Sequence, residues 1–298
     1  MRARLRQVLT VSIASILIAA HTFVHASTLF VLALLKFVLP IAPWRRGLSR
    51  ALVAIAENWI AVNSALMASL GGTRIEVDGL DGLRRDEWYL VLCNHQSWVD
   101  IPVLQSVFNR RIPFMRFFLK RELIWVPVLG LAWWALDFPF MRRYSRAEIE
   151  RRPELRGKDI EATRRACERY RELPVSVMNF VEGTRFTPAK HAASRSAYRH
   201  LLPPRAGGVA FVLETMGDLM QAVLDVTVIY PQGRPSVTDL LSGRVRQVRV
   251  VVRRLAVPRD RLDGGYERDP QARARFQDWI NALWRDKDAT IEAALNPS

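Results

Sequence analysis

The sequence predicts an α/β fold, with a mixed sheet flanked by helices, preceded by an N-terminal membrane-associated helical segment. Two patterns carry this prediction. Beyond residue 72, short apolar runs alternate with segments of helical periodicity, as is typical of α/β domains. Before residue 72 lies an uncharged stretch that is long enough to enter a bilayer. We therefore predict membrane-embedded or membrane-associated helices in residues 1–72 and a globular domain in residues 73–298.

The composition is strongly basic, with a net charge of +15 from 44 basic and 29 acidic residues. Lys occurs at only five positions, so 39 of the basic residues are Arg. A GC-rich genome enriches Arg, but Arg is also the side chain that binds phosphate through two parallel hydrogen bonds. The charge favours an anionic partner such as a membrane surface, a nucleic acid or a phosphorylated substrate. With two Cys and no C-x-x-C pair, neither a disulfide framework nor a metal site is expected.

The N-terminal segment has no charged residue over 29 positions, from Gln7 to Leu35, whereas about 20 are enough for a helix to cross a bilayer core. Arg residues flank it on both sides, so the positive-inside rule does not fix an orientation. The segment spans the bilayer, lies tilted, or enters one leaflet and returns. We expect Lys36 to extend to a lipid headgroup, and His21 and His25 to face a neighbouring helix or the interface.

A cleaved signal peptide is the competing interpretation, because Val24-His25-Ala26 resembles a small-residue cleavage site. However, apolar character continues through Ile41, past the expected end of such a signal. A second helix is predicted from Gly47 to Leu70, where apolar residues recur at three- and four-residue steps, and Gly71-Gly72 ends it. This helix faces a protein core or pairs with the first on the bilayer; the neighbouring uncharged run favours the pair.

The second part of the chain is predicted to contain five strands and five helices. The strands are residues 74–77, 88–93, 175–181, 223–230 and 245–253, and the helices lie near 98–107, 123–135, 158–172, 207–217 and 270–295. Asp269-Pro270 is a good start for the last helix, since Asp caps it and Pro suits the first turn. Two polar stretches, residues 142–157 and 187–205, are expected to be loops.

The apolar run Tyr89 to Cys93 brings His95 to the end of a predicted strand, and Asp100 follows five residues later. Residues five apart do not share a helix face, so the two side chains meet only if His95 lies in the turn and Asp100 in the first helical turn. Ser97 and Asp100 match the S-x-x-D capping signature, so a capped turn without catalytic meaning is the alternative. If they meet, the imidazole can take a hydroxyl proton while the carboxylate fixes its tautomer.

A second polar cluster, Glu182-Gly183-Thr184-Arg185, follows another apolar run. Gly183 lets the backbone approach a ligand closely, Thr184 offers a hydroxyl, and Arg185 offers the planar fork that fits a phosphate. Glu182 can orient Arg185 or a ligand hydroxyl. Taken alone, the cluster also fits a turn with a surface ion pair. Together, the two clusters favour acyl transfer to a phosphorylated alcohol.

In these residues the chain resembles the glycerophospholipid acyltransferases, whose central members are the lysophosphatidic acid acyltransferases. The paired signatures are Asn94-His95 with Asp100, and Glu182 to Arg185. The resemblance covers residues 88–231, and its further matches are Lys120-Arg121-Glu122-Leu123, Pro127-Val128-Leu129-Gly130, Phe140-Met141-Arg142-Arg143 and Asp225 to Pro231. Near the C-terminus, Trp279-Ile280 and Trp284 to Asp288 resemble the branch that includes the lysocardiolipin-type enzymes.

One departure precedes the phosphate-binding Arg. The family often has a Gly-led apolar run there, whereas this chain has Leu136-Asp137-Phe138-Pro139. The departure leaves both Arg142 and Arg143 as candidates, with Arg143 at the family position. The resemblance further assigns supporting positions in its motifs to Asn94, Ser97, Lys120 and Pro231.

The resemblance implies a glycerolphosphate-acyltransferase-like domain in residues 73–298. It implies that His95 takes the proton of a free hydroxyl of a lysophospholipid, that Asp100 orients His95, and that the alkoxide attacks the thioester of acyl-CoA or acyl-carrier protein. No cofactor and no metal are needed. The expected acceptor is 1-acyl-glycerol-3-phosphate, giving phosphatidic acid; lysophosphatidylglycerol and lysocardiolipin are alternatives. The expected phosphate-binding residues are Glu182, Gly183, Thr184, Arg185, Arg143 and Arg142.

Two rival interpretations come from the same residues. Cys93 and His95 are two apart on a strand and would share a face, so a thiol acyl-enzyme is conceivable, although a Cys inside an apolar run is usually inert. A basic scaffold that binds membrane or nucleic acid would also carry the +15 charge, but headgroup attraction explains such charge without nucleic acid. Because both acyl donors are cytosolic, we expect the domain on the cytoplasmic side of its membrane. The compact length and the lack of an obvious organelle signal favour a bacterial inner membrane.

Overall fold

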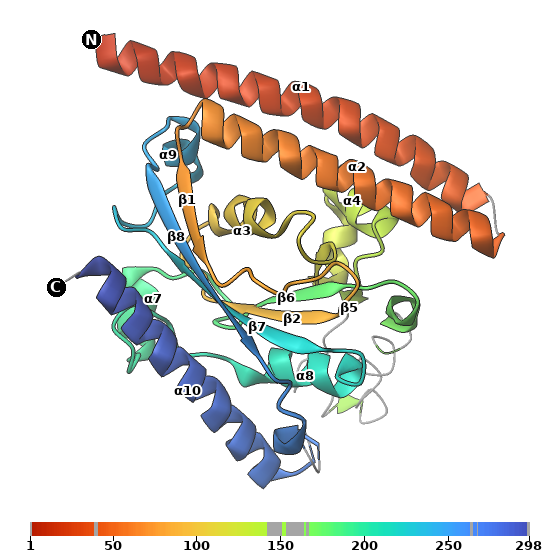
Figure 1. Cartoon of the computed structure of the whole chain (residues 1–298), viewed down its shortest axis with the longest axis vertical. Coiled ribbons are helices and arrows are strands. Elements are labelled where there is room, and N and C mark those ends of the chain that lie inside the picture. Colours follow the sequence, from red (N-terminus) through yellow and green to blue (C-terminus); the bar gives the residue numbers. More distant parts are fainter. Residues whose placement is uncertain are drawn as a thin grey trace.

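The computed structural model of the chain describes residues 2–38, 41–141, 151–152, 164, 167–262, 265–266 and 268–296. Two long helices lie side by side across one side of a twisted sheet, and further helices cover both sheet faces (Figure 1). The predicted fold class, a mixed sheet flanked by helices with apolar N-terminal helices, is confirmed. The boundary at residue 72 falls between the second long helix and the first strand, and as a domain boundary it stays a prediction.

The N-terminal part is an antiparallel helix pair, α1 (Arg2–Val38) and α2 (Ala42–Ser69). Judged by length and composition alone, both helices are long enough and apolar enough to cross a membrane. Polar side chains join them: His21 Nε2 lies 3.0 Å from Asn63 Oδ1, and His25 Nε2 lies 3.1 Å from Asn58 Nδ2. The two histidines therefore face the neighbouring helix, which is one of the two placements predicted from the sequence.

Lys36 does not extend to a headgroup, and that expectation is wrong. Its ammonium lies 2.7 Å from Asp137 Oδ2 and its side chain is only 12% exposed. Ser49 on α2 also donates to Asp137 Oδ2. Asp137 has a positive φ of 61°, a conformation that Asp tolerates better than most residues because its short polar side chain can hydrogen-bond locally. The Asp that departs from the Gly-led run thus ties the helix pair to the rest of the chain.

The main sheet has six strands in the order β1-β8-β7-β2-β6-β3. Strands β3, β6, β2 and β7 run parallel, β8 is antiparallel to β7, and β1 is parallel to β8. The strand bounds are β1 Arg74–Asp78, β2 Tyr89–Cys93, β3 Met115–Phe117, β6 Ser176–Phe180, β7 Ala222–Ile229 and β8 Gln247–Leu255. The two-residue strands β4 (Leu119–Lys120) and β5 (Phe140–Met141) pair separately.

Alternation along β2 divides the core into two layers. Leu90 and Leu92 pack with α8 (Ala206–Met216) and α10 (Pro270–Leu295) on one face, whereas Tyr89, Val91 and Cys93 pack with α3 (Asp100–Phe108) on the other. All five β2 residues are buried, as expected of a central strand in a sheet covered on both faces. The remaining helical elements are η1 Arg121–Trp125, α4 Leu129–Ala135, η3 Glu168–Arg171, α7 Pro188–Ser194, α9 Val237–Leu241 and η4 Arg259–Leu262.

The five predicted strands are confirmed, and the helix expected near 98–107 is α3. Two other expectations need correction. The helix expected near 123–135 is divided into η1 and α4, because Pro127 lacks the N–H that would continue it. The stretch 187–205, expected to be a loop, contains α7, which Thr187 caps by accepting from the Lys190 N–H. Most of 142–157 and of 158–172 lies outside the described residues.

Candidate active site

The site lies at the carboxyl ends of three parallel strands. Cys93 at the end of β2 is in register with Phe180 on β6 and with Val226 on β7. His95, Glu182 and Pro231 each follow one of these strands closely, so the sheet brings them to a common edge. In open α/β sheets this edge is where ligands bind.

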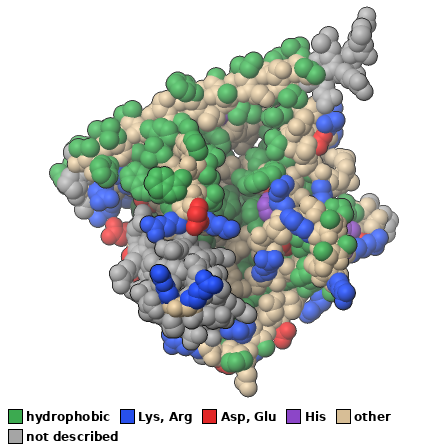
Figure 2. Space-filling model, turned by 180° about the vertical axis from the view of Figure 1, so that it is seen from behind, with side chains coloured by type: hydrophobic (Ala, Val, Ile, Leu, Met, Phe, Trp, Pro, Cys, Tyr) green, Lys and Arg blue, Asp and Glu red, His purple; other side chains and the backbone are tan. Residues whose placement is uncertain are grey.

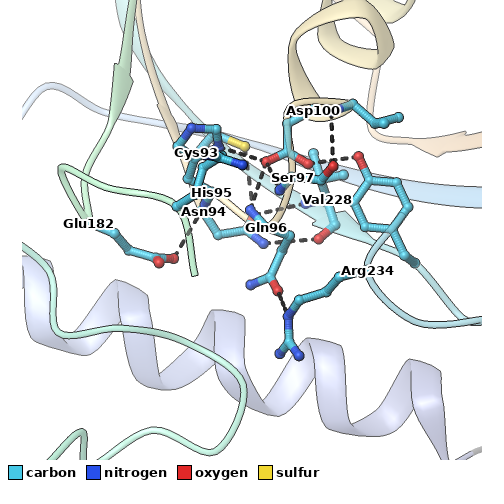
Figure 3. A network of polar contacts seen from close by, with 12 residues as sticks. Cys93, Asn94, His95, Gln96, Ser97, Asp100, Glu182, Val228 and Arg234 are labelled. Atoms are coloured by element: carbon cyan, nitrogen blue, oxygen red, sulfur yellow. Dashed lines mark hydrogen bonds and ion pairs between the residues drawn. The ribbon is translucent and has the colours of Figure 1, made fainter. Parts of the chain in front are cut away.

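The side chains of His95 and Asp100 are in contact, as the catalytic interpretation of their spacing requires. His95 Nδ1 lies 2.8 Å from Asp100 Oδ2 (Figure 3). The same oxygen accepts from the backbone N–H groups of Gln96 (2.7 Å) and Ser97 (2.9 Å), and the Tyr230 hydroxyl donates to Oδ1 (2.7 Å). Asp100 is fully buried, and a buried carboxylate needs such partners. With a carboxylate at Nδ1, the ring proton lies on that nitrogen and the lone pair on Nε2.

The proton-accepting nitrogen is left open. The His95 ring stacks on Phe180 with a centroid separation of 3.9 Å and an interplanar angle of 13°. Its side chain is 11% exposed. Within the described part of the chain, no hydrogen bond reaches Nε2. The imidazole is therefore fixed in tautomer and orientation but free at the atom that would take a substrate proton.

The capping-box interpretation of Ser97 and Asp100 is only half right. Asp100 does reach back to the Ser97 N–H, but the Ser97 hydroxyl donates to the Pro235 carbonyl and accepts from the Val99 N–H instead of capping Asp100. The helix starts at Asp100 itself, with no side-chain cap. The carboxylate is thereby turned into the site, where it serves His95 as well as the turn.

Asn94 and Cys93 make contacts that support the fold around the end of β2. Asn94 makes two 2.9 Å hydrogen bonds with the backbone of Val228, which holds the end of β2 against β7. Cys93 is fully buried, and burial raises the pKa of its thiol well above the usual value. A buried thiol in this state is not a nucleophile, so the geometry gives the thiol acyl-enzyme alternative no support.

Glu182 lies beneath His95 rather than beside Arg185. Its Oε1 accepts from the His95 backbone N–H at 3.3 Å, while Oε2 has no hydrogen-bond partner among the described residues. The side chain is nearly fully buried, and this burial raises the pKa of Glu182 to about 8. Glu182 thus supports the turn that carries His95, and at neutral pH it holds a proton.

The rest of the second cluster opens toward solvent. Gly183 has a φ of 69°, and a Cβ there would lie 3.2 Å from Arg205 Cδ. Thr184 Oγ1 accepts from Lys190 Nζ at 2.6 Å. The Arg185 guanidinium lies 4.3 Å above the Trp98 ring, within cation–π range. These contacts are with neutral groups, so the cations keep their capacity for an anion.

Four cations around the site lack a carboxylate partner in the described chain: Arg185, Lys190, Arg205 and Arg234. The last three were not predicted, because they come from separate segments that only the fold brings together. Arg234 donates to Gln96 Oε1 (Figure 3) and stacks 3.6 Å over Phe186. Arg142 and Arg143 lie outside the described residues.

Several cavities adjoin the cluster, and one of about 240 Å³ lies beside Gln96 and Arg234. Another of about 310 Å³ is lined by Lys120, Phe180, Gly183 and Arg205, among others. A larger one of about 650 Å³ lies between α1–α2 and α3, α4 and α9, with a mainly apolar lining that includes Trp98. Figure 2 shows hydrophobic side chains around a hollow beneath the long helices, with basic side chains at its edge. Trp98 and Arg185 stand where the apolar cavity meets the polar cluster.

The α/β fold, the His–Asp pair and the nearby cations agree with the resemblance to the acyltransferases. A family model described as Acyltransferase matches residues 74–232, which is more than half of the chain. The chain therefore belongs to the acyltransferase family, and the resemblance found in its motifs is confirmed.

Curated relatives and a solved structure agree with this assignment. The chain is 29% identical over 253 residues to lysocardiolipin acyltransferase 1 of Danio rerio, covering 80% of this chain and 60% of the relative. It is 27% identical over 217 residues to 1-acyl-sn-glycerol-3-phosphate acyltransferase gamma of Mus musculus, covering 69% and 53%. The chain thus spans about three fifths of the relatives' length. The crystal structure of the 1-acyl-sn-glycerophosphate acyltransferase PlsC from Thermotoga maritima shares the fold, with a TM-score of 0.56, 17% identity and 98% coverage of both chains.

Proposed function

We propose that the chain transfers an acyl group from an acyl thioester to the free hydroxyl of a lysophospholipid. The observation that carries the proposal is the His95–Asp100 pair, 2.8 Å apart, with Nε2 open. The expected acceptor is 1-acyl-glycerol-3-phosphate, and the product is then phosphatidic acid. Names of relatives support an acceptor of this class, since one is a lysocardiolipin and another a 1-acyl-sn-glycerol-3-phosphate acyltransferase.

In the proposed mechanism, His95 Nε2 takes the proton of the acceptor hydroxyl as that oxygen attacks the thioester carbonyl. The tetrahedral intermediate then collapses, the carbon–sulfur bond breaks, and the thiolate leaves as a thiol with the proton from His95. Asp100 stabilises the imidazolium that exists between these two transfers. The four hydrogen bonds to Asp100 hold its carboxylate in place beside the imidazole.

The acceptor's phosphate is proposed to bind at Arg185, with Thr184 and the backbone at Gly183 close by. Lys190 and Arg205 add positive charge from neighbouring segments. Arg143 and Arg142 remain proposed phosphate ligands, placed by the resemblance alone. Unpaired Arg side chains suit this role, because phosphate recognition needs a fork of free N–H donors.

The apolar cavity is proposed to take an acyl chain. It begins beside Trp98, three residues after His95, and runs beneath α1 and α2. An acyl chain in this cavity would place its reacting end near the imidazole. The donor is proposed to be acyl-CoA or acyl-carrier protein. Because both are cytosolic, we propose that the catalytic part lies on the cytoplasmic side of its membrane, and that this membrane is a bacterial inner membrane.

The proposal is tested by incubating the purified chain in detergent or vesicles with labelled acyl-CoA or acyl-carrier protein and a panel of lysolipids. We expect transfer to 1-acyl-glycerol-3-phosphate above lysophosphatidylglycerol and lysocardiolipin. A different preference would correct the acceptor, and no transfer to any lysolipid would overturn the proposed function. Strong salt-dependent nucleic-acid binding without transfer would favour the basic-scaffold alternative.

Arg185→Ala should mainly raise the KM for the acceptor, because the phosphate loses a bidentate partner. kcat falls as well if the phosphate positions the hydroxyl. The matched control is Arg171→Ala, since Arg171 lies before β6 at the opposite edge of the sheet and pairs with Asp218 at the surface. An unchanged acceptor KM in Arg185→Ala would remove Arg185 from the phosphate role.

A further inference from the structure

The segment from η1 through α4 exposes an unusual set of large apolar side chains. No residue from Leu123 to Leu136 is charged. The exposed members and their exposed fractions are Trp125 85%, Val128 54%, Leu129 51%, Leu131 48% and Trp134 42%. Single exposed apolar residues are normal, but a contiguous group of this size marks an interaction surface.

This exposure is built into the fold. Gly130 lies so close to η1 that a Cβ would sit 2.0 Å from the Ile124 carbonyl oxygen. Its N–H donates to the Val126 carbonyl at 2.8 Å, and Val128 adopts a φ of 64°, which is a strained conformation for a β-branched residue. On the inner side, Ala135 is buried against the helix pair. The tight turn thus holds the apolar side chains outward.

The exposed group is continuous with the apolar surface of α1. The Trp134 ring lies 6.3 Å from that of Phe37, which is 72% exposed. Leu34 and Val38, also on the last turns of α1, are exposed too. Figure 2 shows hydrophobic side chains gathered directly below the long helix, as one surface with it.

We propose that residues 123–136, which we term the apolar tip, form a second membrane contact that inserts into the headgroup–acyl boundary of a bilayer beside α1 and α2. The inference rests on the proposed function, in which the acceptor is a membrane lipid. The 14 uncharged residues are too few to span a bilayer. Trp side chains favour the interface, and the exposed Lys120 and Arg121 precede them, where anionic headgroups would lie.

Two tip residues other than Trp125 also lie along the proposed substrate route. Leu129 and Trp133 line the 650 Å³ apolar cavity, while Lys120 lines the polar cavity beside Gly183. Insertion of the tip would therefore bring the openings of both cavities to the bilayer surface. An acyl chain could then pass from lipid into the apolar cavity without crossing water.

The contact is tested with an environment-sensitive fluorophore at Trp125→Cys in the full chain. Cys93 and Cys167 are both buried, so the introduced thiol is labelled selectively. On adding vesicles of phosphatidylcholine and phosphatidylglycerol, the emission should shift to the blue and be quenched by lipids that carry a quencher near the headgroup. The control label at Ala274→Cys, exposed on α10 away from the long helices (Figure 1), should not change.

A second arm uses function. Trp125→Glu should lower the rate on vesicle-borne lysolipid by about tenfold or more, because a charge is driven into the interface. The rate on a monomeric, short-chain acceptor should equal that of the wild type. Ala274→Glu, which adds the same charge on α10, should leave both rates unchanged.

A water-like emission at position 125 while the protein is bound to vesicles would overturn the membrane contact, and this reading needs no catalysis. Equal rates of Trp125→Glu and the wild type on vesicle-borne lysolipid would overturn it as well. Loss of the proposed function would instead appear as no acyl transfer by the wild type on either acceptor form.

Discussion

At the scale of single residues, the site is organised around one carboxylate. Asp100 accepts from His95, from two backbone N–H groups and from Tyr230. The His–Asp spacing could be predicted from the sequence, because both residues lie in one turn. The contact with Tyr230 could not, since Tyr230 follows β7, 130 positions away, and only the pairing of β2 with β7 brings its hydroxyl close.

Tyr230→Phe tests this arrangement. Removing one hydrogen bond to a buried carboxylate should lower kcat by about tenfold, because such a bond is worth about 1.5–3 kcal/mol. The acceptor KM should stay near the wild-type value. Steady-state kinetics give both numbers, and Tyr198→Phe, which loses only a 3.4 Å contact to the Asn281 carbonyl, is the control. A kcat that matches the wild type would show that Tyr230 does not support the pair.

Glu182 predicts a pH dependence of stability. Burial raises its pKa from 4.5 to about 8, so the folded chain holds this proton more tightly than the unfolded chain does. The resulting stability is fully present below about pH 4.5 and is lost as the pH rises to about 8, at about 1.4 kcal/mol per pH unit.

Glu182→Gln should remove this loss while keeping an oxygen to accept from the His95 N–H. We therefore expect the free energy of unfolding, measured with urea in mild detergent, to fall less steeply for the variant between pH 5 and 8. Parallel curves for the two proteins would contradict the buried, protonated carboxyl.

At the scale of elements, the strands were predictable and the short connections were not. The strands showed as apolar runs because their residues are buried on both faces. Strands β3, β4 and β5 have two or three residues, too few for a periodic pattern. The turns at Val128 and Asp137 escaped prediction because both residues adopt a positive φ without being Gly.

Asp137 is one of the residues that join the helix pair to the rest of the chain. Asp137→Ala should lower the free energy of unfolding by roughly 1–3 kcal/mol, because Lys36 loses its carboxylate in a mostly buried place and Ala strains at positive φ. Asp137→Asn should cost less, since Asn tolerates this conformation and still accepts a hydrogen bond. Thermal unfolding in detergent ranks the variants; equal losses would contradict the argument.

Gly130 is needed for the tight turn of the apolar tip. Gly130→Ala should destabilise the tip, because its Cβ would collide with the Ile124 carbonyl. Limited proteolysis near residues 123–130 should become faster. Gly47→Ala is the control, since a Cβ at Gly47 meets nothing within 4 Å, and in a helix this change stabilises by up to about 1 kcal/mol. Unchanged proteolysis of Gly130→Ala would show that the turn does not depend on Gly.

At the scale of the whole molecule, we propose separate roles for the apolar and the basic surfaces. The apolar helices and the apolar tip face lipid, the unpaired cations at the strand ends receive phosphate, and His95 lies where the two meet. The class of fold followed from the alternation of apolar runs, and the family from the motifs. The three additional cations and the cavities could not be predicted, because they depend on which segments the fold brings together.

The most direct test compares the wild type with His95→Ala in one assay of labelled acyl transfer to 1-acyl-glycerol-3-phosphate. Both proteins must be folded to the same extent, as judged by circular dichroism and thermal unfolding. Because His95 is the proposed general base, the variant should lose a factor of roughly 10²–10⁴ in kcat. A folded His95→Ala protein that transfers the acyl group at a rate near that of the wild type would contradict the account.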